Sequence, residues 1–124
     1  MHTTILLLSL CHALCIQAAV YTWNLGWIYQ NPDGLHRRPV IAINGQWPPP
    51  TLNVTIGELV TINLVNKLGN ESTSLHFHGL FQHGSNAMDG PVGLTQCPVA
   101  PGETFVQTFK VKFAFKHTRN VRLD

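Results

Sequence analysis

Residues 58–65 read ELVTINLV, and this stretch decides the fold class. Successive side chains of an extended strand point to opposite faces, so every second residue lies on the same face. After Glu58 the even-numbered positions are all apolar: Val60, Ile62 and Leu64. The odd-numbered positions include Thr61 and Asn63. This two-residue period predicts a half-buried β-strand.

The sequence on either side of this strand repeats the same features. Residues 103–112 alternate again, with Phe105, Gln107 and Phe109 on one face. Short apolar or aromatic runs at 21–27, 40–43 and 74–81 are separated by Gly and Pro, which favours strands over helices. Further separators are Pro48, Pro49 and Pro50, which exclude regular pairing there. A chain of 124 residues with this pattern predicts a single all-β domain.

The N-terminus has the character of a secretion signal. Residues 1–19 contain an apolar run that is too short to span a bilayer and that ends in small alanines. We therefore expect residues 1–19 to be cleaved, residues 20–112 to form the domain, and residues 113–124 to form a divergent tail. A buried N-terminal helix is the alternative interpretation of the apolar run.

Cleavage would remove Cys11 and Cys15 and leave Cys97 as an unpaired cysteine. Two sequons, at Asn53 and Asn70, are glycosylation acceptors if the chain is secreted. We expect a secreted, extracellular protein, which would be held at the cell surface if a longer parent protein is anchored there. No membrane span is expected within this chain.

The charge excludes one class of partner. Eight Lys and Arg against six Asp and Glu give a net charge of +2, and the basic residues are mostly scattered. A nucleic-acid surface needs clustered cations to neutralise phosphates, so no nucleic-acid partner is expected.

The candidate site is the string Ser-Leu-His-Phe-His-Gly-Leu at residues 74–80. On a strand, His76 and His78 would present their imidazoles to the same side, and Gly79 would let a ligand approach closely. Neutral imidazole binds copper, zinc, iron and nickel, so the pair predicts a metal site but does not by itself identify the metal. A pair of surface or packed histidines is the alternative. We expect His36 and His83 to be solvated loop residues, and the tryptophans Trp23, Trp27 and Trp47 to serve packing.

Two long stretches carry a family resemblance: NPDGLHRRPVIAINGQWPPPTL at residues 31–52, and LGNESTSLHFHGLFQHGSNAMDGPVGLTQCPVAPGETF at residues 68–105. Together they closely resemble the first cupredoxin domain of multicopper oxidases, above all the fungal laccase and ferroxidase branch. The resemblance covers residues 21–110. It implies a plastocyanin-like Greek-key β-sandwich and copper as the cofactor.

The resemblance also implies residue roles. His76 corresponds to a type 2 copper ligand and His78 to a type 3 ligand, in a trinuclear cluster that reduces dioxygen to water. Asp89, in the MDGP motif, corresponds to a residue thought to assist proton delivery; a loop-capping carboxylate is the alternative. Cys97 corresponds to a cysteine that pairs with one in the last domain of laccase-like relatives.

The tail departs from the family pattern. After residue 110 relatives continue with a Gly-Thr-Tyr-Trp-Tyr-His-Ser-His type segment, whereas this chain reads VKFAFKHTRNVRLD, with His117 as its only histidine. We therefore expect an incomplete sandwich that lacks its closing strands, from a truncated product, with an open and aggregation-prone sheet edge.

Three functions follow from these residues. The first is copper binding within an oxidase whose intact parent oxidises phenols or Fe(II) with dioxygen, this chain itself being inactive. The second is a secreted, non-catalytic copper-binding module that uses His76 and His78, with His83 as a possible third ligand. The third is a zinc hydrolase or lyase, which would need Asp89 or His117 to fold back onto the pair.

Overall fold

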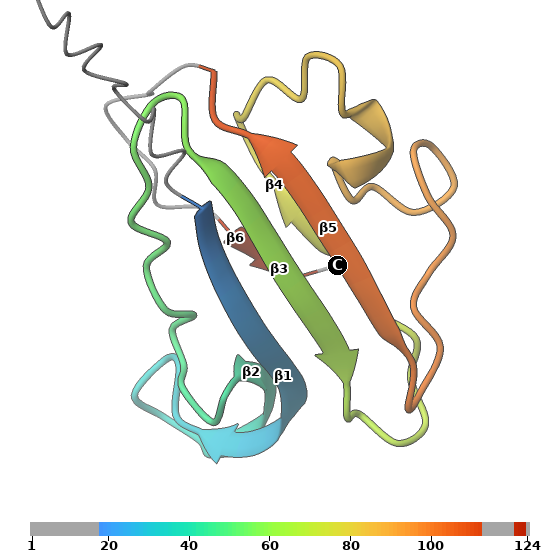
Figure 1. Cartoon of the computed structure of the whole chain (residues 1–124). Helices are drawn as coiled ribbons and strands as arrows, with labels where there is room; N and C mark the ends of the chain where they lie inside the picture. Colours follow the sequence, from blue (N-terminus) through green and yellow to red (C-terminus); the bar gives the residue numbers. More distant parts are fainter. Residues whose placement is uncertain (1–17, 113–120, 124) are drawn as a thin grey trace, which may run out of the picture.

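The computed structural model describes residues 18–112 and 121–123, and these form strands with a single short helical turn (Figure 1). The elements in chain order are β1 (Ala18–Gln30), β2 (Arg38–Ile43), β3 (Leu59–Asn66), β4 (Leu75–Phe77), η1 (Asn86–Met88), β5 (Thr104–Lys110) and β6 (Val121–Leu123). The element η1 is one turn of 3-10 helix. The predicted all-β class is therefore confirmed.

Four strands form the main sheet, in the order β2-β1-β3-β5. The long strand β1 is shared between two neighbours: its residues 18–25 run parallel to β3, and its residues 25–30 run antiparallel to β2. Strand β5 pairs antiparallel with β3 and lies at one edge of the sheet. Among the described residues this sheet does not close into a barrel, and β5 therefore presents an open edge.

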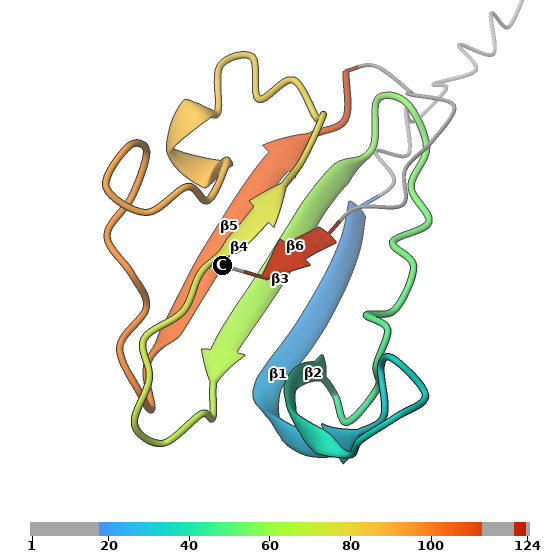
Figure 2. The same cartoon turned by 180° about the vertical axis from the view of Figure 1, so that it is seen from behind.

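A second layer covers one face of the main sheet. Strands β4 and β6 pair antiparallel, and they lie behind the main sheet in Figure 1 and in front of it in Figure 2. The core fills the space between the layers, and its buried members are Trp23, Leu25, Ile43, Leu52, Val60, Ile62, Leu64, Leu75, Phe77, Val99, Phe109 and Val111. This is the two-layer arrangement of a β-sandwich.

The alternation read from the sequence is confirmed in both strands that showed it. In β3 the even-numbered residues are buried, and Val60, Ile62 and Leu64 are fully so. In β5 the side chains of Gln107 and Phe109 point inward, whereas the even-numbered residues of this strand are exposed. Trp23 belongs to the core as expected, while Trp27 is 44% exposed at the surface.

The strand expected at residues 74–81 was predicted too long. β4 ends at Phe77, and the chain turns through His78 and Gly79, with the amide of Leu80 donating to the carbonyl of Phe77 at 3.0 Å. Gly79 has a φ of 82°, a left-handed conformation that is open to glycine and that ends the strand. The second histidine of the pair therefore lies in a turn rather than on the strand.

The expected long loop joins β4 to β5. It contains η1, and near its C-terminal end Val99 forms an isolated bridge with Thr73, which lies just before β4. The buried side chain of Asn66 holds the same region, because its amide donates to the carbonyls of Glu71 and Val99 at 2.8 and 2.9 Å. Its Oδ1 accepts from the amide of Leu68 at 2.9 Å.

A second turn joins β1 to β2. The Oδ1 of Asp33 accepts from the backbone amides of Leu35 and His36 at 3.0 and 3.3 Å. These hydrogen bonds hold the pKa of the Asp33 carboxyl below its ordinary value of 3.8, and the bond from Leu35 has the largest effect. The turn places His36 at the surface, as the sequence predicted.

The two ends of the chain complete the comparison with the sequence. Most of the expected signal, residues 1–17, lies outside the described residues, and β1 begins at Ala18, two residues before the expected domain boundary. In the tail, β6 adds a strand beside β4 that the sequence did not predict, and His117 lies outside the described residues. No helical segment in the described part of the chain has the length and hydropathy of a membrane span.

Candidate metal centre

The two histidines of the candidate site lie next to one another at the end of β4. Their ring centroids are 5.6 Å apart, and the ring planes are nearly perpendicular at 89°. The side chain of His76, on the strand, is 18% exposed, and His78, in the following turn, is exposed. The structure therefore brings the two imidazoles together as the spacing predicted, with one partly enclosed and the other open to solvent.

The ring of His76 is oriented by Asp89. Its Nδ1 lies 2.9 Å from the backbone carbonyl oxygen of Asp89, which also accepts from the amide of Phe77 at 3.3 Å. A carbonyl oxygen only accepts, so this contact places the proton of the neutral ring on Nδ1. The lone pair of His76 is then on Nε2, which is the arrangement that a metal-binding imidazole needs.

The carboxylate of Asp89 adds a negative charge on the same side of the ring. Its Oδ1 lies 3.5 Å from Nδ1 of His76, and its side chain is 25% exposed. The carboxylate therefore faces the nitrogen of His76 that is turned away from a metal on Nε2. Asp89 also follows η1, and its amide donates to the carbonyl of Asn86 at 3.2 Å.

Gly90 allows the loop to lie directly against β4. A Cβ at this position would overlap the carbonyl oxygen of Leu75 and would lie 2.8 Å from the Cα of His76. Gly90 also has a φ of 103°. Only glycine fits both the conformation and the space, and this close approach is what puts the Asp89 carbonyl within reach of His76.

His83, the candidate third ligand, is occupied elsewhere. It is exposed, and Nζ of Lys112 lies 3.1 Å from its Nδ1. An ammonium group only donates, so Nδ1 of His83 is the acceptor in this contact. The nearby positive charge makes this imidazole a poor choice for a cation.

The remaining predicted residues lie at the surface. Cys97 is an exposed free cysteine, and both sequon residues, Asn53 and Asn70, are exposed. Within the described ranges, 18–112 and 121–123, no group of three or more His, Cys, Asp or Glu side chains is arranged to hold a metal ion. The described residues therefore supply two imidazole ligands for a metal ion and no grouped third ligand.

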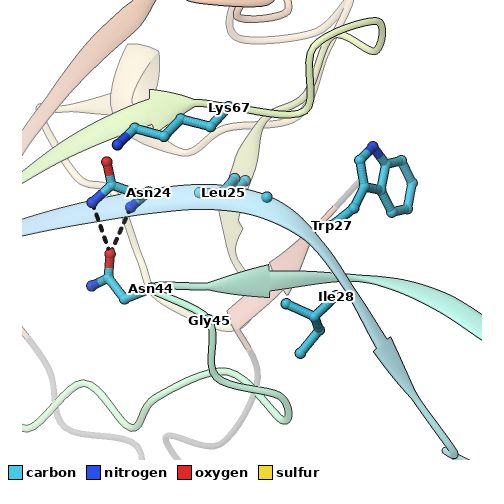
Figure 3. A pocket seen from close by; sticks show the side chains of 8 residues that line it. Asn24, Leu25, Trp27, Ile28, Asn44, Gly45 and Lys67 are labelled. Atoms are coloured by element: carbon cyan, nitrogen blue, oxygen red, sulfur yellow. Dashed lines mark hydrogen bonds between the residues drawn. The ribbon is translucent and has the colours of Figure 1, made fainter.

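A pocket that the sequence analysis missed lies at the other end of the sheet. It has a volume of about 290 Å³, it is open to solvent, and Asn24, Trp27, Asn44 and Lys67 contribute to its lining. Figure 3 shows the amide of Asn44 bound to Asn24, with contacts of 2.9 Å to the backbone amide and 3.0 Å to the side chain. The lining contains one cation and no acid or thiol. Asn44 and Gly45 form a turn beside the pocket, with a φ of 51° at Asn44, and an Asn-Gly pair is a sequence signal for such a turn.

Comparison with known proteins decides the family. The family profile described as multicopper oxidase matches residues 24–116. The chain belongs to the multicopper oxidase family. It is 56% identical over 91 residues to the iron transport multicopper oxidase FET3 of Gibberella zeae, and 47% identical over 109 residues to that of Saccharomyces cerevisiae. These alignments cover 73% and 88% of this chain.

Solved structures of the multicopper oxidase family have the same fold. Fet3p, a multicopper oxidase that functions in iron import, superposes with a TM-score of 0.74 at 49% identity, over 78% of this chain and 18% of Fet3p. The laccase from Botrytis aclada superposes with a TM-score of 0.71 at 36% identity, over 76% of this chain and 17% of the laccase. The expected cupredoxin-like sandwich is thereby confirmed.

The family assignment fixes the cofactor and the general chemistry. Multicopper oxidases are oxidoreductases that use copper, so the predicted cofactor is confirmed. The chain spans only 15% and 17% of the two FET3 relatives. Activities of those whole proteins are therefore not established for this chain.

Proposed function

We propose that this chain is the part of a multicopper oxidase that supplies the imidazoles of His76 and His78 to copper. The observation that carries the proposal is the pairing of the two rings 5.6 Å apart, with Nδ1 of His76 held by the Asp89 carbonyl. Nε2 of His76 and the exposed ring of His78 would be the copper ligands. By the family resemblance, His76 would serve a type 2 copper and His78 a type 3 copper.

Copper would supply the redox chemistry, accepting electrons from a reduced donor and passing them to dioxygen in the complete protein. The residues of this chain would bind and orient the metal. Asp89 would hold a proton near the site, because its carboxylate lies 3.5 Å from Nδ1 of His76. Of the two donors considered for the parent, Fe(II) has more support than a phenol, since the relatives reported above are named iron transport oxidases.

We further propose that this chain alone does not catalyse oxidation. A blue copper centre needs two histidines and a cysteine that converge on one ion, and the described residues contain no group of three such ligands. Two imidazoles with water completing the coordination would bind Cu(II) weakly. A non-catalytic copper-binding module is therefore the second candidate function, and it shares the same two ligands.

The histidine pair is the only support for the zinc alternative. A catalytic zinc site uses three protein ligands and one open position, and no third ligand is grouped with the pair among the described residues. Asp89 turns its carboxylate toward Nδ1 of His76 rather than toward a shared metal. Copper therefore remains the better proposal.

The secretion proposal rests on surface chemistry. Asn53 and Asn70 are exposed, so an oligosaccharyltransferase could reach both sequons, and Cys97 is exposed and free to pair outside this chain. Expression in a secreting eukaryotic host tests this. A secreted chain is expected, with a mass shift that is removed by a glycosidase and by Asn53→Gln with Asn70→Gln. Retention inside the cell would contradict secretion, and an unmodified secreted chain would contradict glycosylation.

Two measurements test the functional proposal. After dialysis against Cu(II), the purified chain should retain copper that His76→Ala and His78→Ala each lose, and equal retention by the variants would contradict the ligand assignment. Oxygen consumption with Fe(II) or a phenol should not exceed that of the double variant. Turnover above that background would overturn the proposed inactivity.

A further inference from the structure

Gln107 is a polar side chain on the inward face of β5. Its neighbours on that face are Phe105, partly buried against the core, and Phe109, which is 3% exposed. Gln107 itself is fully buried. A buried amide is unfavourable unless hydrogen bonds replace those it made to water, so its presence at this position needs a reason.

Both protons of the Gln107 amide are used. Nε2 donates to the backbone carbonyl of Leu75 at 3.0 Å and to that of Met88 at 3.1 Å. These two residues directly precede His76 and Asp89. One side chain on the main sheet therefore holds both the strand that carries the first histidine and the turn that carries its hydrogen-bond partner.

The positions of Leu75 and Met88 matter because the orientation of the His76 ring depends on the distance between their two segments. The 2.9 Å contact from Nδ1 of His76 to the Asp89 carbonyl joins β4 to the loop after η1. Gly90 removes the steric obstacle to that approach, and Gln107 supplies bonds that fix both segments to β5. Metal-binding histidines generally need such outer contacts to hold their tautomer and ring orientation.

We propose that Gln107 is a positioning residue for the copper site: its amide holds Leu75 and Met88 so that the Asp89 carbonyl stays on Nδ1 of His76. This inference rests on the proposed function, because it assumes that His76 binds copper. The Oε1 of Gln107 has no hydrogen-bond partner in the described part of the chain. An amide selected for core packing alone would be better replaced by an apolar side chain of similar length.

Copper affinity distinguishes positioning from packing. Gln107→Met keeps the size of the side chain and removes both donors, and Ser74→Ala is a matched control. Ser74 is fully buried two residues before His76, and its hydroxyl has no partner among the described residues. Titration of the full chain with Cu(II), followed by electron paramagnetic resonance, should show a Kd raised about tenfold and an altered copper hyperfine splitting for Gln107→Met. Ser74→Ala should match the wild type.

The outcomes separate the two proposals. Absence of copper binding by the wild-type chain would contradict the proposed function and remove the basis of this inference. Wild-type binding together with an unchanged Kd and spectrum in Gln107→Met would overturn the positioning role alone. If Gln107→Met does not fold, nuclear magnetic resonance of the wild-type chain decides: the Nε2 protons should exchange slowly and shift on loading with diamagnetic Cu(I). Identical shifts in the free and loaded chain would overturn the role.

Discussion

The backbone carbonyl oxygen of Asp89 lies 2.9 Å from Nδ1 of His76 and thereby fixes which nitrogen of that ring is available. The bond joins β4 to a loop position 13 residues later in the chain. It depends on backbone rather than on the carboxylate, so the geometry would survive a change of the Asp89 side chain.

Gly90→Ala should disturb both stability and the site. The added Cβ would overlap the carbonyl of Leu75, and the φ of 103° is unfavourable for alanine. We expect a loss of about 2–4 kcal/mol in the free energy of unfolding, measured with urea. Gly93→Ala is the control, because Gly93 has a φ of 76° but open space around it, and it should lose about 1 kcal/mol. Equal losses would contradict the close-approach argument.

Asn66→Ala should destabilise the long loop. The buried Asn66 side chain makes three hydrogen bonds to backbone groups, two from its Nδ2 and one to its Oδ1. Leaving these groups unpaired should cost about 2–4 kcal/mol in urea unfolding. Asn63→Ala on the opposite face of β3 removes one long contact, 3.4 Å to Thr22, and should cost much less. A similar cost for the two variants would rule out the anchoring role.

Val106→Lys should reduce self-association. Val106 is 49% exposed on β5, the edge strand of the main sheet, and charged residues at sheet edges prevent strand addition. Sedimentation velocity over a range of concentrations should show less oligomer for the variant than for the wild type. Leu59→Lys, on a strand paired on both sides, should change the distribution little. An effect from Leu59→Lys alone would indicate association through another surface.

The sequence predicted the features that follow from local alternation. The inward positions of β3 and β5 follow from the two-residue period of a strand. The rings of His76 and His78 also lie next to each other, but His78 reaches this position from a turn after β4. The division of β1 between a parallel and an antiparallel neighbour could not be read in this way. Pairing of Ala18 with Leu59 joins residues far apart in the chain, and alternation does not encode which strands become neighbours.

Side-chain contacts with backbone groups were also beyond the sequence. The bonds of Gln107 to Leu75 and Met88 depend on how the two layers pack, and an alternating pattern marks Gln107 only as inward-facing. The end of β4 at Phe77 followed from Gly79, which the sequence analysis interpreted as space for a ligand rather than as a turn. The types and spacing of the site residues were thus predicted from the sequence, whereas the orientation of their side chains came only from the structure.

Electron paramagnetic resonance of the Cu(II)-loaded chain tests the central claim most directly, because it reports whether the His76 and His78 imidazoles hold copper. We predict an ordinary Cu(II) signal with nitrogen coupling and without the intense blue absorption of a cysteine-ligated centre. The signal should be lost in the His76→Ala, His78→Ala double variant. It should remain in the His36→Ala, His83→Ala control, which removes two exposed loop imidazoles. A signal that survives the first pair of substitutions, or disappears with the second, would contradict the account.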